Sequence, residues 1–380
     1  MDINTSILLK DYTAMHLGGP ARFMAEVTTK EDLVGVIERA QAQNLPFFVL
    51  GDGSNVIATD EGYEGVIILN RIAGFEVIED TRYATKIKIG AGEEWDGVVE
   101  RTVGMLLSGI EGLSGIPGRT GATPVQNVGA YGQEIADTFV ELEAYDLTTK
   151  TFVTLTKEQC GFGYRTSIFK PIRDRKYIIV SVTLLLAKEE PQPPFYESLQ
   201  KYLDDKAVTY FTVKVIRDAV LAIRETKLPN PTLLPNSGSF FKNPIIERWQ
   251  LNDIQTKYPD VPFYEMADDT FKIPAGWLIE TAGMKGHASH GFKTFETNAL
   301  VIVNETGTSY KDLELFKAEI VNKVLELFRL KLEQEPELLE PISVSEEKVQ
   351  PANAIRRQER PLLHQNEPTE DKSSASGSYF

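Results

Sequence analysis

The segment Phe47-Phe48-Val49-Leu50-Gly51-Asp52-Gly53-Ser54-Asn55 decides the fold of the first part of this chain. Its four apolar residues predict a short buried strand, and its two glycines predict a sharp turn directly after it. Glycine frees backbone N–H groups to point at a ligand, and Ser54 and Asn55 add side-chain donors. The segment therefore predicts an anion nest suited to a pyrophosphate, with a plain strand-to-turn connection as the alternative. It is not a Rossmann turn, because Val56 stands where that motif has its last glycine.

A second segment, Gly112–Gly132, is too rich in glycine to form a regular helix or a central strand. It predicts a second nest, whose small residues would let a large planar ring approach the backbone. Two such nests would clamp a dinucleotide from both sides. Around them, the spacing of apolar residues predicts a helix from Thr29 to Leu45 and strands at Val66–Leu69, Lys86–Gly90 and Tyr177–Ala187.

The bulk properties describe a globular protein without a basic surface. The chain has 380 residues, enough for two or three domains, and a formal net charge of −15. This acidic balance argues against nucleic-acid binding, so an anionic ligand would need a local basic pocket. Neither a signal peptide nor an apolar run of the roughly 20 residues that span a bilayer is visible, which predicts a cytoplasmic protein without membrane insertion.

Cysteine and histidine are scarce in this chain. The single cysteine, Cys160, excludes an internal disulfide and a cysteine-based metal site, and we expect it in a strand. His287-Ala-Ser-His290 could supply two metal ligands, but no carboxylate pair stands nearby in the sequence. We therefore expect a solvated loop there and predict no metal.

The segment Gly238-Ser239-Phe240-Phe241-Lys242-Asn243-Pro244 combines a hydroxyl, two aromatic rings, a cation and an amide. We expect it to hold a flat, partly apolar, anionic ligand against Ser239. The alternative is a hairpin with both rings in the core and Ser239 capping a turn. A second basic, proline-pinned segment, Glu225–Pro231, lies shortly upstream.

Composition also divides the chain into parts. Residues 1–72 are predicted as an α/β part and residues 73–206 as a strand-rich one, in which the proline-rich stretch 189–205 is either a mobile flap or a linker. Residues 207–330 form a third part that ends in an amphipathic helix. Beyond residue 340 the chain is poor in apolar side chains, so residues 341–380 are predicted to be disordered.

These segments together carry a family resemblance. The chain resembles the UDP-N-acetylenolpyruvoylglucosamine reductases, flavoenzymes that complete the muramic acid precursor of bacterial peptidoglycan, and among them the type I enzymes with a tyrosine-bearing flap. The likeness runs from about residue 13 to residue 335. Its landmarks, in order, are Leu50–Asn55, Ile116–Gly118, Gln126–Gly132, Phe162–Lys170, Glu225–Pro244, Ala275–Glu280 and Lys285-Gly286.

The resemblance implies an α+β chain: a two-subdomain FAD-binding fold of the vanillyl-alcohol-oxidase type, then a C-terminal α+β substrate-binding domain. The FAD-binding subdomains would be residues 1–72 and 73–206, the substrate domain residues 207–330, and residues 331–340 a strand returning to the active site. It also implies non-covalent FAD, NADPH as co-substrate and UDP-N-acetylglucosamine enolpyruvate as substrate. Hydride would pass from NADPH to flavin N5 and then, by a ping-pong route, to the enolpyruvyl carbon. A monomer is expected.

Three catalytic residues follow from the resemblance. Arg165, in Tyr-Arg-Thr-Ser, matches the family residue that binds the substrate carboxylate. Negative charge builds on this carboxylate as hydride adds, and a guanidinium stabilises it. Ser239 is matched to the proton donor, supported by the positive charge of Lys227 and Lys242. The acid beside the enolate is matched to Glu335.

The choice of Glu335 leaves an alternative open. The family often has proline before this glutamate, whereas here Pro336 follows it. A two-residue slip would therefore select Glu337.

The remaining assignments follow the same landmarks. Substrate contacts are implied for Tyr196, Lys227, Asn243, Tyr264 and Lys285. Cofactor contacts are implied for Gly51, Gly53, Ser54, Asn55, Val56, Pro117, Gly118, Gly121, Ala122, Gln126, Asn127, Gly129, Ala130 and Tyr131.

Two other functions are weighed against this one. An FAD-dependent alcohol or hydroxy-acid oxidase or dehydrogenase of the same fold is disfavoured by the Gly238–Pro244 segment, by Arg165 and by the lack of an obvious histidine base. A nucleotide-binding scaffold without activity would be excluded by a flavin spectrum of the purified protein.

Overall fold

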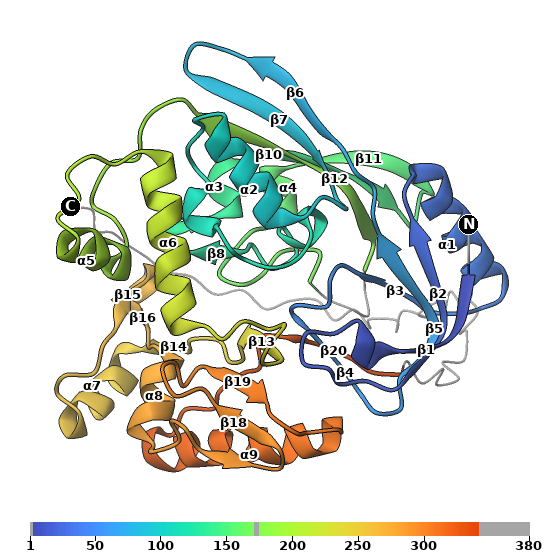
Figure 1. The fold of residues 1–380 in the computed structure, drawn as a ribbon. Helices are drawn as coiled ribbons and strands as arrows, with labels where there is room; N and C mark the ends of the chain where they lie inside the picture. The colour runs from blue at the N-terminus through green and yellow to red at the C-terminus, as the bar shows by residue number, and fades with distance from the viewer. Residues whose placement is uncertain (1–2, 171–174, 342–380) are drawn as a thin grey trace, which may run out of the picture. The chain divides into compact units, whose positions relative to one another are not determined.

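The computed structural model describes residues 3–170 and 175–341, so the tail predicted for residues 341–380 lies almost wholly outside the described residues. The described residues form an α+β fold in which several separate sheets are flanked by helices (Figure 1). Among these residues no helix is both long enough and apolar enough to cross a membrane.

The first sheet has the strand order β1-β2-β5-β3, with β1 antiparallel to β2 and the other pairs parallel. Helix α1 connects β2 to β3 and buries an apolar stripe that includes Leu33 and Ile37 against this sheet. Thr29 caps it by accepting a hydrogen bond from the N–H of Asp32, an interaction worth about 1 kcal/mol. The helix ends at Ala42, before the predicted end at Leu45. The bounds are β1 Ile3–Leu8, β2 Pro20–Val27, α1 Lys30–Ala42, β3 Phe47–Leu50 and β5 Tyr63–Asn70.

The second sheet is antiparallel, with the order β11-β10-β12-β7-β6 (Figure 1). Its core contains the fully buried Trp95, and β12 has the bounds that the sequence predicted. Cys160 ends the short helix α4, so the expectation of a strand there was wrong; the glycine after it, in the left-handed conformation, ends the helix. The bounds are β6 Phe75–Asp80, β7 Ala84–Gly90, α2 Trp95–Gly104, α3 Ile135–Thr138, β10 Phe139–Asp146, β11 Thr151–Thr156, α4 Lys157–Cys160 and β12 Tyr177–Ala187.

The glycine-rich segment 112–132 contains only short elements, as its composition predicts. They are the 3₁₀ turns η2 Glu111–Leu113 and η3 Thr120–Ala122 and the two-residue strand β8 Gly129–Ala130, which pairs with β9 Gln133–Glu134. The first 3₁₀ turn of the chain, η1 Leu9–Asp11, follows β1.

The stretch 189–205 has no helix or strand in its first part and then forms helix α5, Glu197–Asp205. Helix α6, Val213–Lys227, packs against α5, α2 and η2. Arg217 of α6 fixes this packing, because its guanidinium binds both carboxylate oxygens of Asp96 in α2, at 2.6 and 3.0 Å.

The C-terminal region contains a four-stranded sheet, a three-stranded sheet and the long helix α9, Tyr310–Phe328. The predicted apolar stripe of α9, which includes Phe316 and Ile320, is buried in the largest core cluster. The four-stranded sheet is ordered β13-β19-β18-β17 and the three-stranded one β14-β16-β15. The bounds are β13 Asn236–Ser239, β14 Ile245–Glu247, α7 Arg248–Lys257, β15 Tyr264–Glu265, η4 Ala267–Asp269, β16 Thr270–Lys272, α8 Ala275–Thr281, β17 Ala288–Ser289, β18 Phe292–Thr294 and β19 Val301–Asn304.

The last described strand returns to the N-terminal part of the chain. Strand β20, Glu337–Leu339, pairs in parallel with β4, Val56–Ala58, which follows the first glycine-rich turn. The segment before β20 is held between Asn55, which accepts from the N–H of Glu337, and Phe240, which accepts from the N–H of Glu335.

Candidate active site

The two glycine-rich segments contact each other through side chains. The hydroxyl of Ser54 donates to the carbonyl of Pro117 over 3.2 Å, and Nδ2 of Asn55 donates to Oε1 of Gln126 over 2.9 Å. In the described part of the chain, no backbone N–H of residues 51–55 donates a hydrogen bond to another protein group. This turn therefore keeps a row of free donors, which is what an anion nest requires.

Gly53 is fixed by its surroundings as well as by its backbone. Its φ is +62°, and a Cβ on it would lie 2.0 Å from the carbonyl oxygen of Tyr12. Gly118 has a φ of +122° and a Cβ there would meet the Ser54 hydroxyl at 3.1 Å. Glycine at position 53 therefore lets the first loop pack against Tyr12, and glycine at position 118 lets the second loop approach Ser54 of the first.

Two arginines share one carboxylate beside the first nest. Asp52 lies 2.7 Å from Nε of Arg119 and 3.2 Å from the guanidinium of Arg71, which also donates to the carbonyl of Gly51. The three side chains carry one net positive charge next to the free N–H groups. This arrangement fits a pyrophosphate, because cations and backbone donors together compensate its negative charge.

The other residues predicted to bind the cofactor lie in the same two loops, except that Val56 belongs to a strand and the Asn127 side chain is used within the protein. Val56 is the first residue of β4 and pairs with Glu337. Asn127 is buried and both ends of its amide are used within the protein, by the N–H of Ala136 and the carbonyl of Gly163. Its side chain therefore joins the second loop to the turn at residue 163. Gly121 and Ala122 lie in η3, Gly129 and Ala130 form β8, Tyr131 follows β8, and Pro117 lies in the loop before η3.

Arg165 occupies a tight turn between Gly163 and Thr166, whose backbones bond each other in both directions. Its φ is +54°, the left-handed region that this turn position normally reserves for glycine or asparagine, at a cost of about 1 kcal/mol or more. One guanidinium nitrogen donates to the carbonyl of Gly129 over 3.1 Å. The turn therefore aims a cation at the second glycine-rich loop.

Glu335 lies beside that guanidinium. Its Oε1 is 2.9 Å from Nε of Arg165, yet the Nε–H does not point at this oxygen and has no acceptor among the described residues. Burial raises the pKa of the Glu335 carboxyl above its ordinary value, and the nearby charges of Arg165 and Lys170 only partly offset this effect. The carboxyl is thus shifted toward its protonated, proton-donating form.

Glu337 has a different environment. It belongs to β20, and its carboxylate is bound by Arg175, whose guanidinium lies 4.8 Å from the ring centre of Phe48. Burial raises its pKa as well, with Arg175 opposing. The structure thus brings Glu335, and not Glu337, to Arg165.

Ser239 ends strand β13, and the residues that follow it are joined to the Glu335 segment. The N–H of Glu335 donates to the carbonyl of Phe240, and the N–H of Lys242 donates to the carbonyl of Glu333, both over 2.9 Å. The Ser239 hydroxyl is half-buried and forms no hydrogen bond with any residue that the structure describes. It remains free to bind a ligand.

The expectation that the two rings of this segment hold a ligand was wrong. Phe240 is 0% and Phe241 is 1% exposed, and both belong to the largest core cluster, so the alternative reading applies to the rings. Their burial anchors the backbone between Ser239 and Lys242. The segment offers a ligand its polar side chains only.

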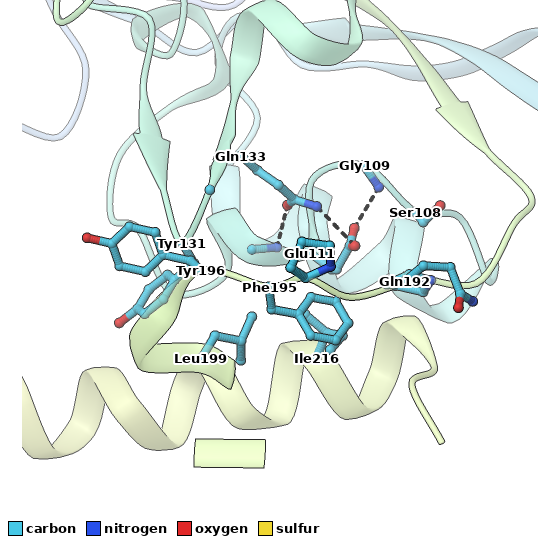
Figure 2. A pocket seen from close by; sticks show the side chains of 14 residues that line it. Ser108, Gly109, Glu111, Tyr131, Gln133, Gln192, Phe195, Tyr196, Leu199 and Ile216 are labelled. Carbon is cyan, nitrogen blue, oxygen red and sulfur yellow. Dashed lines mark hydrogen bonds between the residues drawn. The ribbon is translucent and has the colours of Figure 1, made fainter. Parts of the chain in front are cut away.

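Tyrosines connect the remaining predicted residues. Tyr196 has its ring centre 6.4 Å from that of Tyr131 and 6.5 Å from that of Tyr264, with the two hydroxyls of the latter pair 3.4 Å apart. Figure 2 shows Tyr131 and Tyr196 next to each other at a cavity of about 300 Å³ that both line. Tyr196 directly precedes α5, and burial raises the pKa of its phenol.

Two residues that the sequence did not single out lie in the same cluster. Lys272 of β16 has its Nζ 5.1 Å from the ring centre of Tyr164 and 5.2 Å from that of Tyr264. Burial and the charge of Arg165 lower the pKa of Lys272, and burial raises that of Tyr164. Tyr164 stands next to Arg165 in the sequence, which is a usable signal, whereas nothing in the sequence marks Lys272.

Of the last three predicted substrate residues, only Asn243 contacts the described residues around Arg165. Asn243 accepts a hydrogen bond from the N–H of Ala275 over 2.8 Å and contacts Tyr164. Lys227 is exposed at the C-terminal end of α6. Lys285 donates to Glu280 over 2.7 Å, and no contact in the described structure joins it to the Arg165 cluster.

His287 and His290 flank the two-residue strand β17 in a partly exposed segment, but a carboxylate that the sequence did not place there lies close to both. His287 and His290 both contact Glu319 of α9, at 2.6 and 3.2 Å, and the His287 ring stacks on Phe316. The carboxylate comes from a distant part of the sequence, which local reading could not reveal. Within residues 3–170 and 175–341, no group of three or more His, Cys, Asp or Glu side chains is arranged to hold a metal ion.

Comparisons with known proteins show the family to which the chain is similar. Residues 21–155 match the family model of an FAD binding domain, and residues 230–339 match that of the C-terminal domain of UDP-N-acetylenolpyruvoylglucosamine reductase. A UDP-N-acetylenolpyruvoylglucosamine reductase of Ralstonia nicotianae is 38% identical over 319 residues, covering 83% of this chain and 93% of the relative. Another, of Flavobacterium johnsoniae, is 36% identical over 336 residues, covering 88% and 99%. The crystal structure of the Thermus caldophilus reductase is similar, with a TM-score of 0.62 at 26% identity, covering 89% of this chain and 99% of that one.

Proposed function

Because the chain belongs to the UDP-N-acetylenolpyruvoylglucosamine reductase family, we propose that it reduces UDP-N-acetylglucosamine enolpyruvate to UDP-N-acetylmuramate with NADPH, in the synthesis of peptidoglycan precursors. The observation that carries the proposal is the convergence of Arg165, Glu335 and the Ser239 segment. A guanidinium, a carboxyl and a free hydroxyl are the groups that the reduction of an enolpyruvyl carboxylate needs.

FAD fits the two glycine-rich loops. The free N–H groups of residues 51–55 and the cationic Arg71–Asp52–Arg119 group would hold its pyrophosphate, and the small residues of the 117–131 loop would let its ring approach the backbone. When bound, FAD supplies a carrier that takes hydride from NADPH and passes it to the substrate. Of the described side chains in these loops, none is a cysteine or histidine, so non-covalent binding is proposed.

Arg165 binds the substrate carboxylate in this proposal. Its Nε–H is buried and lacks an acceptor, so a carboxylate oxygen would satisfy it. As hydride adds to the neighbouring double bond, negative charge builds on that carboxylate and the guanidinium stabilises it. Glu335, shifted toward its protonated form by burial, donates a hydrogen bond to the same charge.

Ser239 gives its proton to the carbon next to the carboxylate. A hydroxyl is a weak acid in water, so the oxyanion that remains must be stabilised by cations, a role proposed for Lys242 and Lys227. The Lys242 ammonium, which lies 3.2 Å from Glu333, would exchange that partner for the oxyanion. The buried rings of Phe240 and Phe241 fix the position of the hydroxyl, which supplies part of the acceleration.

Two tyrosines, one asparagine and two lysines bind the uridine diphosphate part of the substrate in this proposal. Tyr196 and Tyr264 present two hydroxyls to the diphosphate, and Asn243, Lys227 and Lys285 complete the site; Lys285 would exchange its contact with Glu280 for the ligand. In the same proposal, residues 1–72 and 73–206 bind FAD, residues 207–330 bind substrate and residues 331–340 return to the active site. The protein acts in the cytoplasm as a monomer.

An anaerobic experiment with two additions tests the function. The protein is expected to bleach its flavin absorbance on addition of NADPH and to recover it when UDP-N-acetylglucosamine enolpyruvate follows. Bleaching by a simple alcohol or hydroxy acid would favour the oxidase alternative. A colourless preparation that stays colourless with added FAD would contradict the cofactor assignment.

A further inference from the structure

A lysine that the proposed reaction does not use, Lys170, contacts the turn that carries Arg165. Lys170 is half-buried, and its ammonium donates a hydrogen bond to the backbone carbonyl of Arg165 over 2.9 Å. Arg165 is the residue with the left-handed φ of +54°. A non-glycine residue keeps that conformation only where its neighbours enforce it, and this hydrogen bond acts on the strained residue itself.

The chain between the two residues is also fixed. Ser167 donates its hydroxyl to the carbonyl of Val125 over 2.6 Å and accepts from the N–H of Phe169, which is buried. The N–H of Lys170 donates to the carbonyl of Ser167. The buried Phe169 and the bonds of Ser167 therefore fix the backbone at Lys170. The hydrogen bond from Lys170 to Arg165 thus comes from a rigid segment.

Building on the proposed reductase function, we propose that Lys170 is a positioning residue of the reaction: its ammonium holds the Arg165 turn in its left-handed conformation, and its charge acts on the carboxyl of Glu335. It does so without touching substrate. The two effects act on the two groups that would receive the substrate carboxylate, so Lys170 should influence the reduction of the enolpyruvyl group and leave the reaction with NADPH largely unaffected.

Among the described residues, Arg165 lies 2.9 Å from the Glu335 carboxyl, and Tyr164, Lys170 and Lys242 also interact with it electrostatically. Removing the charge of Lys170 leaves Arg165 and Lys242 as the cations that favour the ionised form. The pKa of Glu335 should therefore rise further, because burial already opposes ionisation.

Three substitutions separate the two effects. Lys170→Met keeps an unbranched side chain as far as Cε and removes both the donor and the charge. Lys170→Gln keeps a donor for the carbonyl of Arg165 and removes the charge, whereas Lys170→Arg keeps both. Lys157→Met is the matched control, because Lys157 is an exposed lysine in the neighbouring helix α4. If the methionine variant fails to fold, the comparison of Gln with Arg still isolates the charge.

The first measurement does not depend on activity. The carboxyl of Glu335 is titrated by carbon NMR in protein labelled at glutamate, and its resonance is identified by its loss in Glu335→Gln. We expect the pKa to rise by about half a unit to one unit in Lys170→Met and Lys170→Gln, and to stay near wild type in Lys170→Arg and Lys157→Met. An unchanged titration in both charge-removing variants would overturn the electrostatic part, whatever reaction the protein catalyses.

The second measurement separates the two half-reactions by stopped flow. In Lys170→Met we expect the reduction of substrate by the pre-reduced enzyme to slow by about 10- to 100-fold, with the rate of flavin reduction by NADPH within about 2-fold of wild type. Lys170→Gln should recover part of the loss and Lys170→Arg most of it. An equal loss in both half-reactions, or no recovery with arginine, would reduce Lys170 to a packing residue. A wild-type protein that does not act on the substrate at all would contradict the proposed function and leave the titration as the test of Lys170.

Discussion

The backbone N–H of Glu335 donates a hydrogen bond to the carbonyl oxygen of Phe240 over 2.9 Å, although the two residues belong to distant parts of the chain. Ser239 directly precedes Phe240, so the proposed proton donor and the proposed acid are on segments bonded to each other. A shift of either segment would displace both groups together. The relative position of the two groups therefore depends on this backbone contact as well as on their side-chain conformations.

Ser239→Ala should block protonation of the substrate. We expect the reduction of substrate by pre-reduced enzyme to fall by about 10²- to 10⁴-fold, with flavin reduction by NADPH close to normal. Stopped-flow absorbance of the flavin measures both steps. Ser237→Ala is the matched control, because its buried hydroxyl has no hydrogen-bond partner among the described residues. An equal loss in both half-reactions of Ser239→Ala would reject the assignment.

Glu335→Gln and Glu337→Gln should separate catalysis from stability. The first removes the acid beside Arg165, and we expect the substrate half-reaction to slow by about 10²-fold or more. The second leaves Arg175 without its carboxylate partner, so we expect a loss of roughly 3 kcal/mol in the free energy of unfolding with a small effect on the rate. Half-reaction rates and denaturant titrations check the pair. The reverse pattern would select Glu337 as the acid.

Tyr196→Phe removes one hydroxyl of the tyrosine cluster. If that hydroxyl binds the diphosphate, the affinity for the nucleotide substrate should fall by about 10-fold, while the NADPH half-reaction stays unchanged. Equilibrium binding to the oxidised enzyme measures the affinity. Tyr210→Phe serves as the control, because Tyr210 is 69% exposed. Unchanged substrate affinity in Tyr196→Phe would remove this hydroxyl from the site.

Local sequence patterns predicted the elements whose signal is local. The alternation in Lys86–Gly90 and the run Tyr177–Ala187 are strands in the structure, and the stripe of α9 is buried. Contacts between distant segments were not predictable in this way. Phe240 and Phe241 could not be assigned to core or ligand without the helix α9 and strands that surround them, and the partner of His287, Glu319, lies on another element. The roles of the site residues themselves remain predictions.

Gly53→Ala should distort the backbone of the turn at residues 51–55, which is the proposed pyrophosphate site. Its Cβ would lie 2.0 Å from the carbonyl of Tyr12 and its φ of +62° is unfavourable for alanine, so we expect a loss of more than about 2 kcal/mol in stability, with weaker FAD binding. Gly35→Ala is the control: it lies within α1 with no atom within 4 Å of its Cβ, and it should gain about 0.5–1 kcal/mol. Thermal unfolding followed by flavin fluorescence compares the two. A stable, yellow Gly53→Ala protein would contradict the predicted close approach.

Glu319 should make stability depend on pH in the acid range. Its hydrogen bond with His287 is the main interaction that lowers the pKa of the Glu319 carboxyl below its ordinary value of 4.5. A carboxyl with a lowered pKa in the folded state contributes stability above its unfolded pKa, and this contribution is lost as the pH falls through the folded value. Glu319→Gln should therefore be less stable than wild type at neutral pH, and the difference should close below pH 4.5. Thermal midpoints across the acid range test this; a difference that persists unchanged in acid would contradict it.

The parallel pairing of β20 with β4 has a consequence for biosynthesis. Residues 56–58 leave the ribosome early, but their partner strand, Glu337–Leu339, is synthesised only after almost all of the described chain. The nascent chain must therefore wait, with this edge unpaired, until the last strand emerges. The contact between Glu335 and Arg165 can therefore form only after nearly all of the described chain has been synthesised.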